Sequence, residues 1–265
     1  GTSAPPATYS VTGMIPVIVI GIIGIIGNGL VLIVLLCNKK ARGNQRNILI
    51  LNQSLIDLLT SVDFIITFVS LGIPKSYEGL GVWWCWLVDI EIPMWSIISI
   101  STVNLMAITA ERYVIVIHPT FYRNHITKKV MYALVVSVWI FSGPVYLLMN
   151  YPFANNFDGI CDYYVIFSTV LSYTDIVYGL LYFIAPLVMF LICYPRMILV
   201  LKRRTRVSPV DGQNHQAMSK KQINLTNVML SVSVVFVICY SPSYTLVYLS
   251  KSGVIQLGKV YTVYL

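Results

Sequence analysis

The chain has 265 residues, of which 57% are hydrophobic and 11% are charged, and its formal net charge is +8. Ordinary soluble domains carry about 25% charged residues, so this composition excludes one. The basic residues flank apolar blocks and do not gather on one soluble face, which disfavours a nucleic-acid-binding protein.

Apolar residues are gathered into blocks long enough to cross a lipid bilayer. Residues 1–13 are rich in Ala, Pro, Ser and Thr and are interpreted as a short tail. Residues 14–37 form the first block, which is longer than the roughly 20 residues that a spanning helix needs. Backbone hydrogen bonds have to close internally in lipid, so each block predicts a helix. Five more complete blocks follow, at 47–73, 85–117, 130–150, 173–201 and 223–250, and a seventh begins near Leu257.

The predicted fold is therefore an all-α membrane protein, a seven-transmembrane helix bundle with six complete spans and the start of the seventh. Residues 14–265 would form this single domain, and the chain is interpreted as a fragment. The sequence holds no recognisable catalytic constellation, so no enzyme is predicted. The three His residues are spaced wrongly for a metal site.

Lys and Arg set the predicted orientation of the bundle. Of the 18 basic residues, all but Lys75, Lys251 and Lys259 lie at span ends and loops that alternate to one side. The positive-inside rule makes that side cytoplasmic and the amino-terminal tail extracellular, which predicts a multi-pass protein of the plasma membrane. Acidic residues gather on the other side, which would concentrate cations there, although solvated loop charge explains them equally well. They are Asp63, Glu78, Asp89, Glu91, Asp158, Asp162 and Asp175.

Two of the five cysteines stand in predicted outer segments, where a disulfide can persist. Pairing of Cys85 with Cys161 would fasten the loop before the fifth span to the top of the third. Cys37, Cys193 and Cys239 lie within spans and are interpreted as small hydrophobic residues.

Polar side chains inside the predicted spans indicate a buried cluster. Asp57 lies in the middle of the second span, where a carboxylate has to find partners or a cation, or take up a proton. Asn28 and Asn52 lie at similar depth. Hydrogen bonding between helices without any further role is the alternative interpretation.

A charged triplet stands at the inner end of the third span. Glu111, Arg112 and Tyr113 follow residues 95–110, which contain no ionisable side chain. Charges at such a boundary are costly unless they pair or reach water, so they favour a functional role. In the sixth span, Pro242 removes a helical hydrogen bond and predicts a kink.

Taken together, these motifs resemble the rhodopsin-like (class A) G protein-coupled receptors over nearly the whole chain. Six motifs in the right order on correctly spaced helices are far more specific than any one of them. In chain order they are Gly27-Asn28-Gly29-Leu30-Val31, Asn52-x-Ser54-Leu55-x-Asp57, Glu111-Arg112-Tyr113 with Pro119, Trp139, Pro186 with Tyr194, and Phe236-x-x-Cys239-Tyr240-x-Pro242.

The resemblance implies a receptor that signals to a heterotrimeric G protein. Glu111 would restrain Arg112 at rest, and Tyr194 would reach Arg112 on activation. Pro242 would be the pivot for an outward swing of the sixth helix, which opens an inner crevice for a helix of the G protein.

The resemblance also implies a sodium-binding pocket and an outer disulfide. Asp57 and Ser101 would belong to the sodium pocket, with Asn28 in the same polar core. Cys85 and Cys161 match the disulfide of the outer face.

The chain departs from the family pattern in helix six and stops before the Asn-Pro-x-x-Tyr segment of helix seven. Tyr240, which follows Phe236 in the activation motif, stands where the family usually has Trp. Lys220, Lys221 and Gln222 replace an acid that some members use to hold the arginine.

The ligand class is predicted from the outer half of the bundle. Ile92 and Met94, at the depth where amine receptors carry Asp, are not acidic, which disfavours an amine. A peptide with a basic residue is the preferred ligand. Its pocket would be formed by acidic and aromatic residues near the mouth: Asp89, Glu91, Trp95, Tyr173, Tyr178, Tyr240, Tyr244 and Tyr248.

Two rival functions remain open. An opsin shares every motif above but needs a Lys in helix seven to hold retinal as a Schiff base. A membrane transporter or channel predicts substrate flux and has no need of Glu111, Arg112 and Tyr113.

Overall fold

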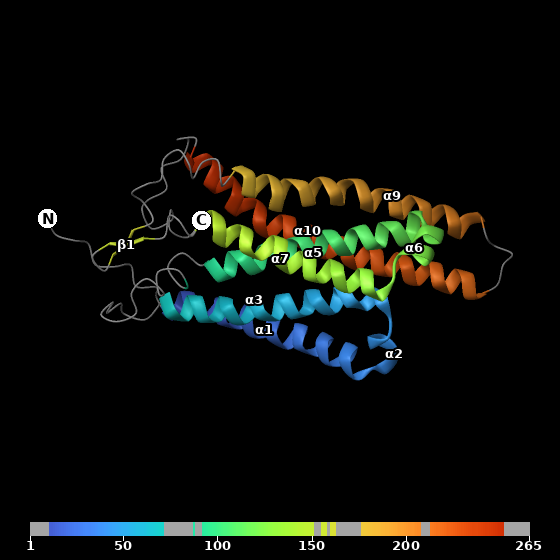
Figure 1. Cartoon of the computed structure of the whole chain (residues 1–265), viewed down its shortest axis with the longest axis horizontal. Helices are drawn as coiled ribbons and strands as arrows, with labels where there is room; N and C mark the ends of the chain where they lie inside the picture. The colour runs from blue at the N-terminus through green and yellow to red at the C-terminus, as the bar shows by residue number, and fades with distance from the viewer. Residues whose placement is uncertain are drawn as a thin grey trace.

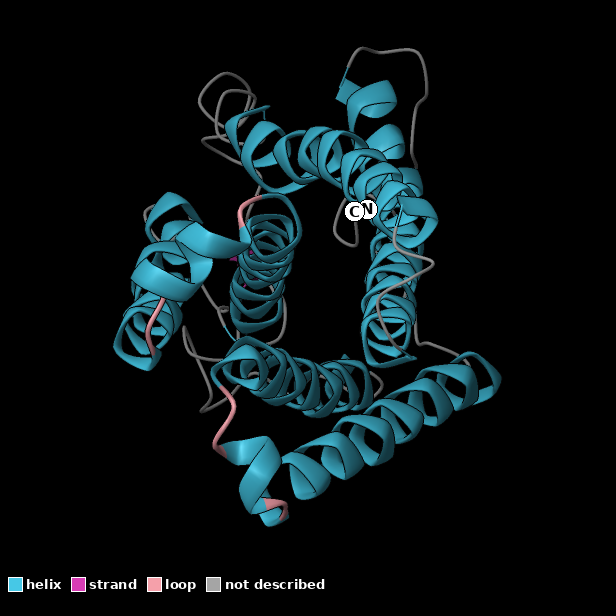
Figure 2. Cartoon of the chain, turned by 90° about the vertical axis from the view of Figure 1, so that its right-hand side faces the viewer, coloured by secondary structure: helices cyan, strands magenta, loops and turns pink. Residues whose placement is uncertain are grey.

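The computed structural model describes residues 11–71, 87, 92–150, 155–157, 160–162, 176–207 and 213–251. It confirms a helical bundle, in which long helices run side by side (Figures 1 and 2). The long helices are α1 (Val11–Cys37), α3 (Ile48–Leu71), α5 (Ile92–Ile117), α7 (Lys128–Asn150), α9 (Ala185–Val207) and α10 (Gln213–Lys251).

Several described helices can cross a membrane by length and composition. Four qualify, namely α1, α3, α5 and the continuous segment Ile176–Arg204, which includes most of α9. Helix α7 and the short α6 (Pro119–His125) add a fifth span if this pair, bent by 89°, is counted as one. In α10 the apolar stretch is Thr226–Cys239. Each of the six predicted complete blocks therefore contains a long helix, whereas the seventh lies outside the described residues.

The boundaries of two helices differ from the predicted blocks. Helix α10 has 39 residues, which is about 58 Å of helix and far more than a bilayer core needs. It begins at Gln213, ten residues before the apolar block, because Lys and Gln are good helix formers outside lipid. Helix α1 starts at Val11, inside the predicted tail of residues 1–13.

The fifth span contains a π-helical turn, η4 (Leu180–Ile184). Pro186 follows it and has no backbone N–H to donate. The proline ring also crowds the carbonyl of the residue four positions earlier, Tyr182. A widened turn just before a proline relieves this crowding.

Two asparagines turn the chain between α1 and α3. The side chain of Asn38 accepts hydrogen bonds from the backbone N–H groups of Lys40 and Ala41, and so caps the short helix α2 (Lys39–Arg42). Asn44 caps the 3-10 turn η1 (Gln45–Asn47) by accepting from the N–H of Arg46. These caps fix the loop between α1 and α3, which lies beside the C-terminal end of α5.

A buried hydrophobic cluster lies where α5, α9 and α10 meet. Its buried members are Leu105, Val116, Phe190, Tyr194, Met197 and Leu201, and Met229, Leu230 and Phe236 of α10 pack against it. Large apolar side chains elsewhere point outward, such as Ile23 of α1, which is 65% exposed. An apolar exterior of this kind is what lipid contact requires.

A short hairpin lies beyond one end of the bundle (Figure 1). Strands β1 (Asn155–Phe157) and β2 (Ile160–Asp162) pair antiparallel, with Asn156 opposite Cys161. Cys85 and the side chain of Cys161 lie outside the described part of the structure, so their disulfide stays a prediction.

Candidate functional site

The charged triplet lies near the C-terminal end of α5, with Glu111 and Arg112 buried. Glu111 and Arg112 are only 7% and 8% exposed. Helix α6 begins directly after α5 with Pro119 in its first turn and brings Tyr122 back over Glu111. The Tyr122 hydroxyl donates a hydrogen bond of 2.8 Å to Oε1 of Glu111. The sequence analysis did not predict Tyr122 as a site residue, because nothing in its local pattern marks it.

The environment of Tyr122 keeps its phenol protonated. Helix α6 is a connecting helix that follows the α5 span. Burial raises the pKa of Tyr122 to about 12, and the hydrogen bond to Glu111 acts in the same direction. At neutral pH Tyr122 is therefore a hydrogen-bond donor to the carboxylate.

Arg112 is held by the loop between α1 and α3. Its Nη2 donates to the main-chain carbonyl of Arg46 at 3.3 Å. Among the described residues, Nε of Arg112 and Oε2 of Glu111 are buried without a hydrogen-bond partner. Unpaired buried polar atoms are costly, so this pair retains free hydrogen-bonding capacity that a new partner can use.

Tyr194 connects three helices above this pair. Its side chain is 2% exposed, and its hydroxyl lies 3.2 Å from Oγ1 of Thr109 in α5 and 3.0 Å from Oγ of Ser233 in α10. Tyr194 itself comes from α9. The residue that the sequence predicted as the partner of Arg112 is thus joined here to Thr109, one helical turn before Arg112.

Asp57 and Ser101 lie together in the middle of the bundle, as the sequence predicted. Oδ1 of Asp57 accepts a hydrogen bond of 3.2 Å from the Ser101 hydroxyl. It also accepts one of 2.7 Å from Nε2 of Gln53, one helical turn earlier in α3. Asn28 is directed at its own helix instead, since its amide donates to the carbonyl of Gly24 at 3.0 Å.

A row of amides extends this cluster to a third helix. Nδ2 of Asn104 donates to Oε1 of Gln53 at 2.8 Å, and Nδ2 of Asn52 donates to Oδ1 of Asn104 at 2.9 Å. The indole N–H of Trp139 in α7 donates to Oδ1 of Asn52 at 2.9 Å. Sequence analysis did not single out Gln53 or Asn104. The available signal was a glutamine four residues before Asp57, on the same helix face.

The half of the bundle that contains the N-terminal part of α5 brings two predicted pocket residues together. The hydroxyl of Tyr178 lies 2.7 Å from Oγ of Ser99 and donates to the carbonyl of Trp95 at 3.3 Å. Its ring packs against Tyr182, with 4.6 Å between the ring centroids. The other predicted pocket side chains lie outside the described part of the structure: Asp89, Glu91, Tyr173, Tyr240, Tyr244 and Tyr248.

Comparison with known proteins identifies the family. A family model described as "7 transmembrane receptor (rhodopsin family)" matches residues 27–257. The chain belongs to this rhodopsin family of receptors. It is therefore a class A G protein-coupled receptor, a multi-pass membrane protein of signal transduction and not an enzyme.

Individual relatives of this rhodopsin-family receptor are distant. It is 25% identical over 234 residues to the allatostatin-A receptor of Bombyx mori, covering 84% of this chain and 62% of that protein. It is 29% identical over 256 residues to neuropeptide Y receptor type 6 of Mus musculus, covering 90% and 67%. It is 23% identical over 274 residues to a GQ-coupled rhodopsin of Mizuhopecten yessoensis, covering 95% and 53%. The chain thus spans between about half and two thirds of the length of these relatives.

Proposed function

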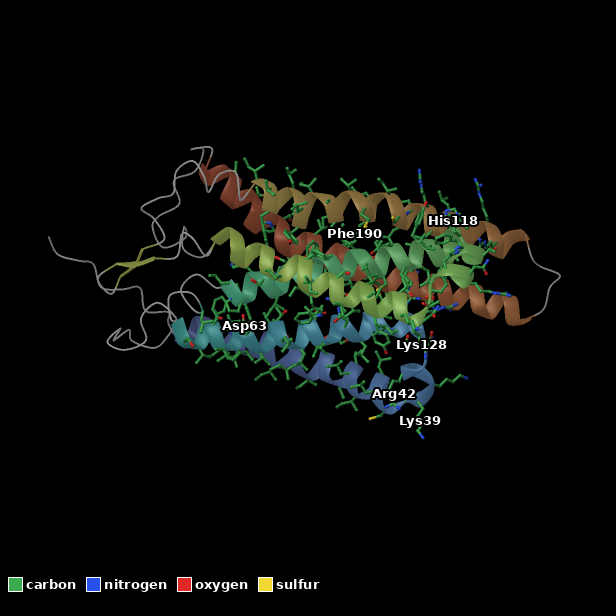
Figure 3. The ribbon with its side chains drawn as sticks, in the orientation of Figure 1. Lys39, Arg42, Asp63, His118, Lys128 and Phe190 are labelled. Carbon is green, nitrogen blue, oxygen red and sulfur yellow. The ribbon has the colours of Figure 1, made fainter. Side chains whose placement is uncertain are left out.

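We propose that this receptor lies in the plasma membrane with its amino terminus outside and transmits the binding of an extracellular peptide to a heterotrimeric G protein. The observation that carries the proposal is the buried pair Glu111 and Arg112 at the basic end of the bundle. Figure 3 supports this orientation, since Lys39, Arg42, His118 and Lys128 lie toward the same end, far from Asp63.

The contacts of Arg112 and Tyr194 suggest how the resting state is held. Arg112 is tied to the main chain of Arg46, and Tyr194 is tied to Ser233 of α10. An outward movement of α10 would break the bond between Tyr194 and Ser233. Tyr194 could then turn toward Arg112, and the space left by α10 would admit a helix of the partner. An agonist drives this change only as far as it binds the open state more tightly.

A peptide with a basic residue is the ligand that the outer half supports best. The names of two relatives refer to peptide ligands. Among the described residues, Oδ2 of Asp63 is buried without a hydrogen-bond partner. A cationic side chain of the ligand would satisfy it, and Trp95 and Tyr178 contribute aromatic rings on α5 and the fifth span.

The test uses the full-length receptor in cells with a G protein activation reporter. Synthetic peptides grouped by net charge serve as probes. Basic peptides should activate, and Asp63→Asn, Asp89→Asn and Glu91→Gln should each weaken their potency. Equal responses to acidic and basic peptides, or unchanged potency in all three variants, would remove the electrostatic part of the proposal.

An opsin is the second candidate, because one relative is a rhodopsin. Purified full-length protein incubated with retinal would then develop a visible absorption band, and borohydride would fix the chromophore covalently to a lysine. A protein that stays colourless and responds to a peptide supports the first proposal.

A further inference from the structure

We infer that the side-chain amide of Gln53 takes the place of the cation in the Asp57 cluster, so that this receptor closes its polar core without sodium. The inference depends on membership of the rhodopsin family, for which a sodium pocket at Asp57 and Ser101 was expected, and not on the proposed ligand. It follows from the contacts of Gln53, Asp57 and Ser101 and from the direction of the hydrogen bonds around them.

The amide nitrogen of Gln53 sits between the two oxygens that a cation would need. Nε2 lies 2.7 Å from Oδ1 of Asp57 and 2.7 Å from Oγ of Ser101. A primary amide has two N–H protons, so each of them has one of these oxygens as acceptor. The nitrogen has no lone pair to offer a metal ion, and hard cations take oxygen ligands. The residues present therefore do not fit a sodium ion at this point.

The orientation of the Gln53 amide is fixed from the far end of the network. The indole of Trp139 is a donor only, so the group of Asn52 that faces it has to be the oxygen. The nitrogen of Asn52 then faces Asn104, so Asn104 has to present its oxygen as the acceptor. The nitrogen of Asn104 in turn requires the oxygen of Gln53, which leaves Nε2 of Gln53 for Asp57.

Flipping the side-chain amides of this network is costly in free energy. If Gln53 offered its oxygen to a cation, its nitrogen would face the nitrogen of Asn104. Asn104 and then Asn52 would have to flip as well, and the nitrogen of Asn52 would end against the N–H of Trp139. Asn104 is 0% exposed, so the mismatched groups would have no water to turn to. Each buried polar group that is left without a hydrogen-bond partner destabilises the bundle.

The described surroundings offer no cluster of His, Cys or carboxylate ligands as a replacement site. Among the described residues no group of three or more His, Cys, Asp or Glu side chains could hold a metal ion. Asn28, the third expected member of the polar core, donates to Gly24 in its own helix. The chain of hydrogen bonds that begins at Trp139 thus ends at the carboxylate of Asp57. There the N–H group of Gln53 presents the positive end of its dipole to the carboxylate in place of a positive ion.

The test measures thermal unfolding of the full-length receptor in lipid nanodiscs, in NaCl and in N-methyl-D-glucamine chloride at equal ionic strength. Wild-type protein should have the same Tm in both salts. Gln53→Leu and Gln53→Ala remove the amide, and at least one of them should gain a sodium-specific rise of about 2–4 °C. Adding Asp57→Asn to that variant should abolish the rise. Loss of network contacts alone lowers Tm equally in both salts and cancels in the comparison.

Two results would overturn the inference. One is a wild-type Tm that rises in NaCl and loses this rise with Asp57→Asn, because sodium would then bind beside Gln53. The other is that neither Gln53 variant responds to sodium although both fold, because Gln53 would then not be what excludes the ion. The readout needs neither ligand nor G protein, so its failure leaves the proposed function untouched.

Discussion

The Tyr122 hydroxyl donates a hydrogen bond of 2.8 Å to the carboxylate of Glu111, which joins helix α6 to the C-terminal end of α5. Oε1 of Glu111 is occupied in this way, whereas its Oε2 and Nε of the adjacent Arg112 are buried without a hydrogen-bond partner among the described residues. The position of α6 and the state of the charged pair are therefore coupled. A movement of this helix alters the hydrogen bonding of Glu111 directly.

Tyr122→Phe should destabilise the receptor and raise its ligand-free signalling. The variant removes one donor from a buried carboxylate, and hydrogen bonds to charged groups contribute about 1.5–3 kcal/mol. Tm measured in nanodiscs and basal G protein activation in cells check the two effects. Tyr132→Phe on the exposed face of α7 is the matched control, and equal behaviour of the two variants would contradict the prediction.

The same bond predicts a pH dependence that appears only in alkali. The pKa of Tyr122 is raised from 10.0 to about 12, so its stabilising contribution is complete below pH 10.0 and is lost as the pH rises through about 12. The difference in Tm between wild type and Tyr122→Phe should be constant from neutral pH to pH 10.0 and shrink above it. If the difference in Tm already shrank around neutral pH, a group other than Tyr122 would control the pH dependence of this bond.

Ser233→Ala and Tyr194→Phe should have opposite effects on signalling. Ser233→Ala removes the tie between Tyr194 and α10 at a cost of about 0.5–1.5 kcal/mol to the resting bundle, so basal activity should rise. Tyr194→Phe also removes the hydroxyl that is expected to reach Arg112 in the active state, so agonist-stimulated activity should fall. Dose–response curves of both variants check this. If signalling activity rose in both variants, or fell in both, the proposed switch would be contradicted.

Gly24→Ala should destabilise the bundle, whereas Gly27→Ala should not. A Cβ at Gly24 would meet Oγ of Ser61, with Cβ of Ser61 at 3.1 Å, where α1 packs on α3. A Cβ at Gly27 meets nothing within 4 Å, and Ala is favoured over Gly inside a helix by about 1 kcal/mol. Thermal unfolding of the two variants separates the steric effect of the contact with Ser61 from the higher helix propensity of Ala. A Gly24→Ala variant as stable as Gly27→Ala would mean that the helices adjust freely.

Trp139→Phe should lower the stability of the receptor by more than the loss of ring contacts alone. Removal of the indole N–H leaves Oδ1 of Asn52 buried without its donor, which costs about 1–3 kcal/mol. The double variant Trp139→Phe with Asn52→Leu removes both partners, so its loss of stability should be smaller than the sum of the two single losses. Additive losses would show that the bond contributes nothing.

The sequence alone determined the all-helical membrane fold, because lipid forces every long apolar block to satisfy its backbone within a helix. It also predicted the nearness of Asp57 and Ser101, whereas the functional role of Glu111 and Arg112 stays a prediction. It did not predict that Gln53, Asn104 and Trp139 would point along one row, or that Tyr122 would fold back onto Glu111. Those relationships depend on how three helices are rotated about their own axes and on the direction of a short connecting helix. Packing between distant segments decides both, and the local pattern indicates only that Gln53 and Asp57 share a helix face.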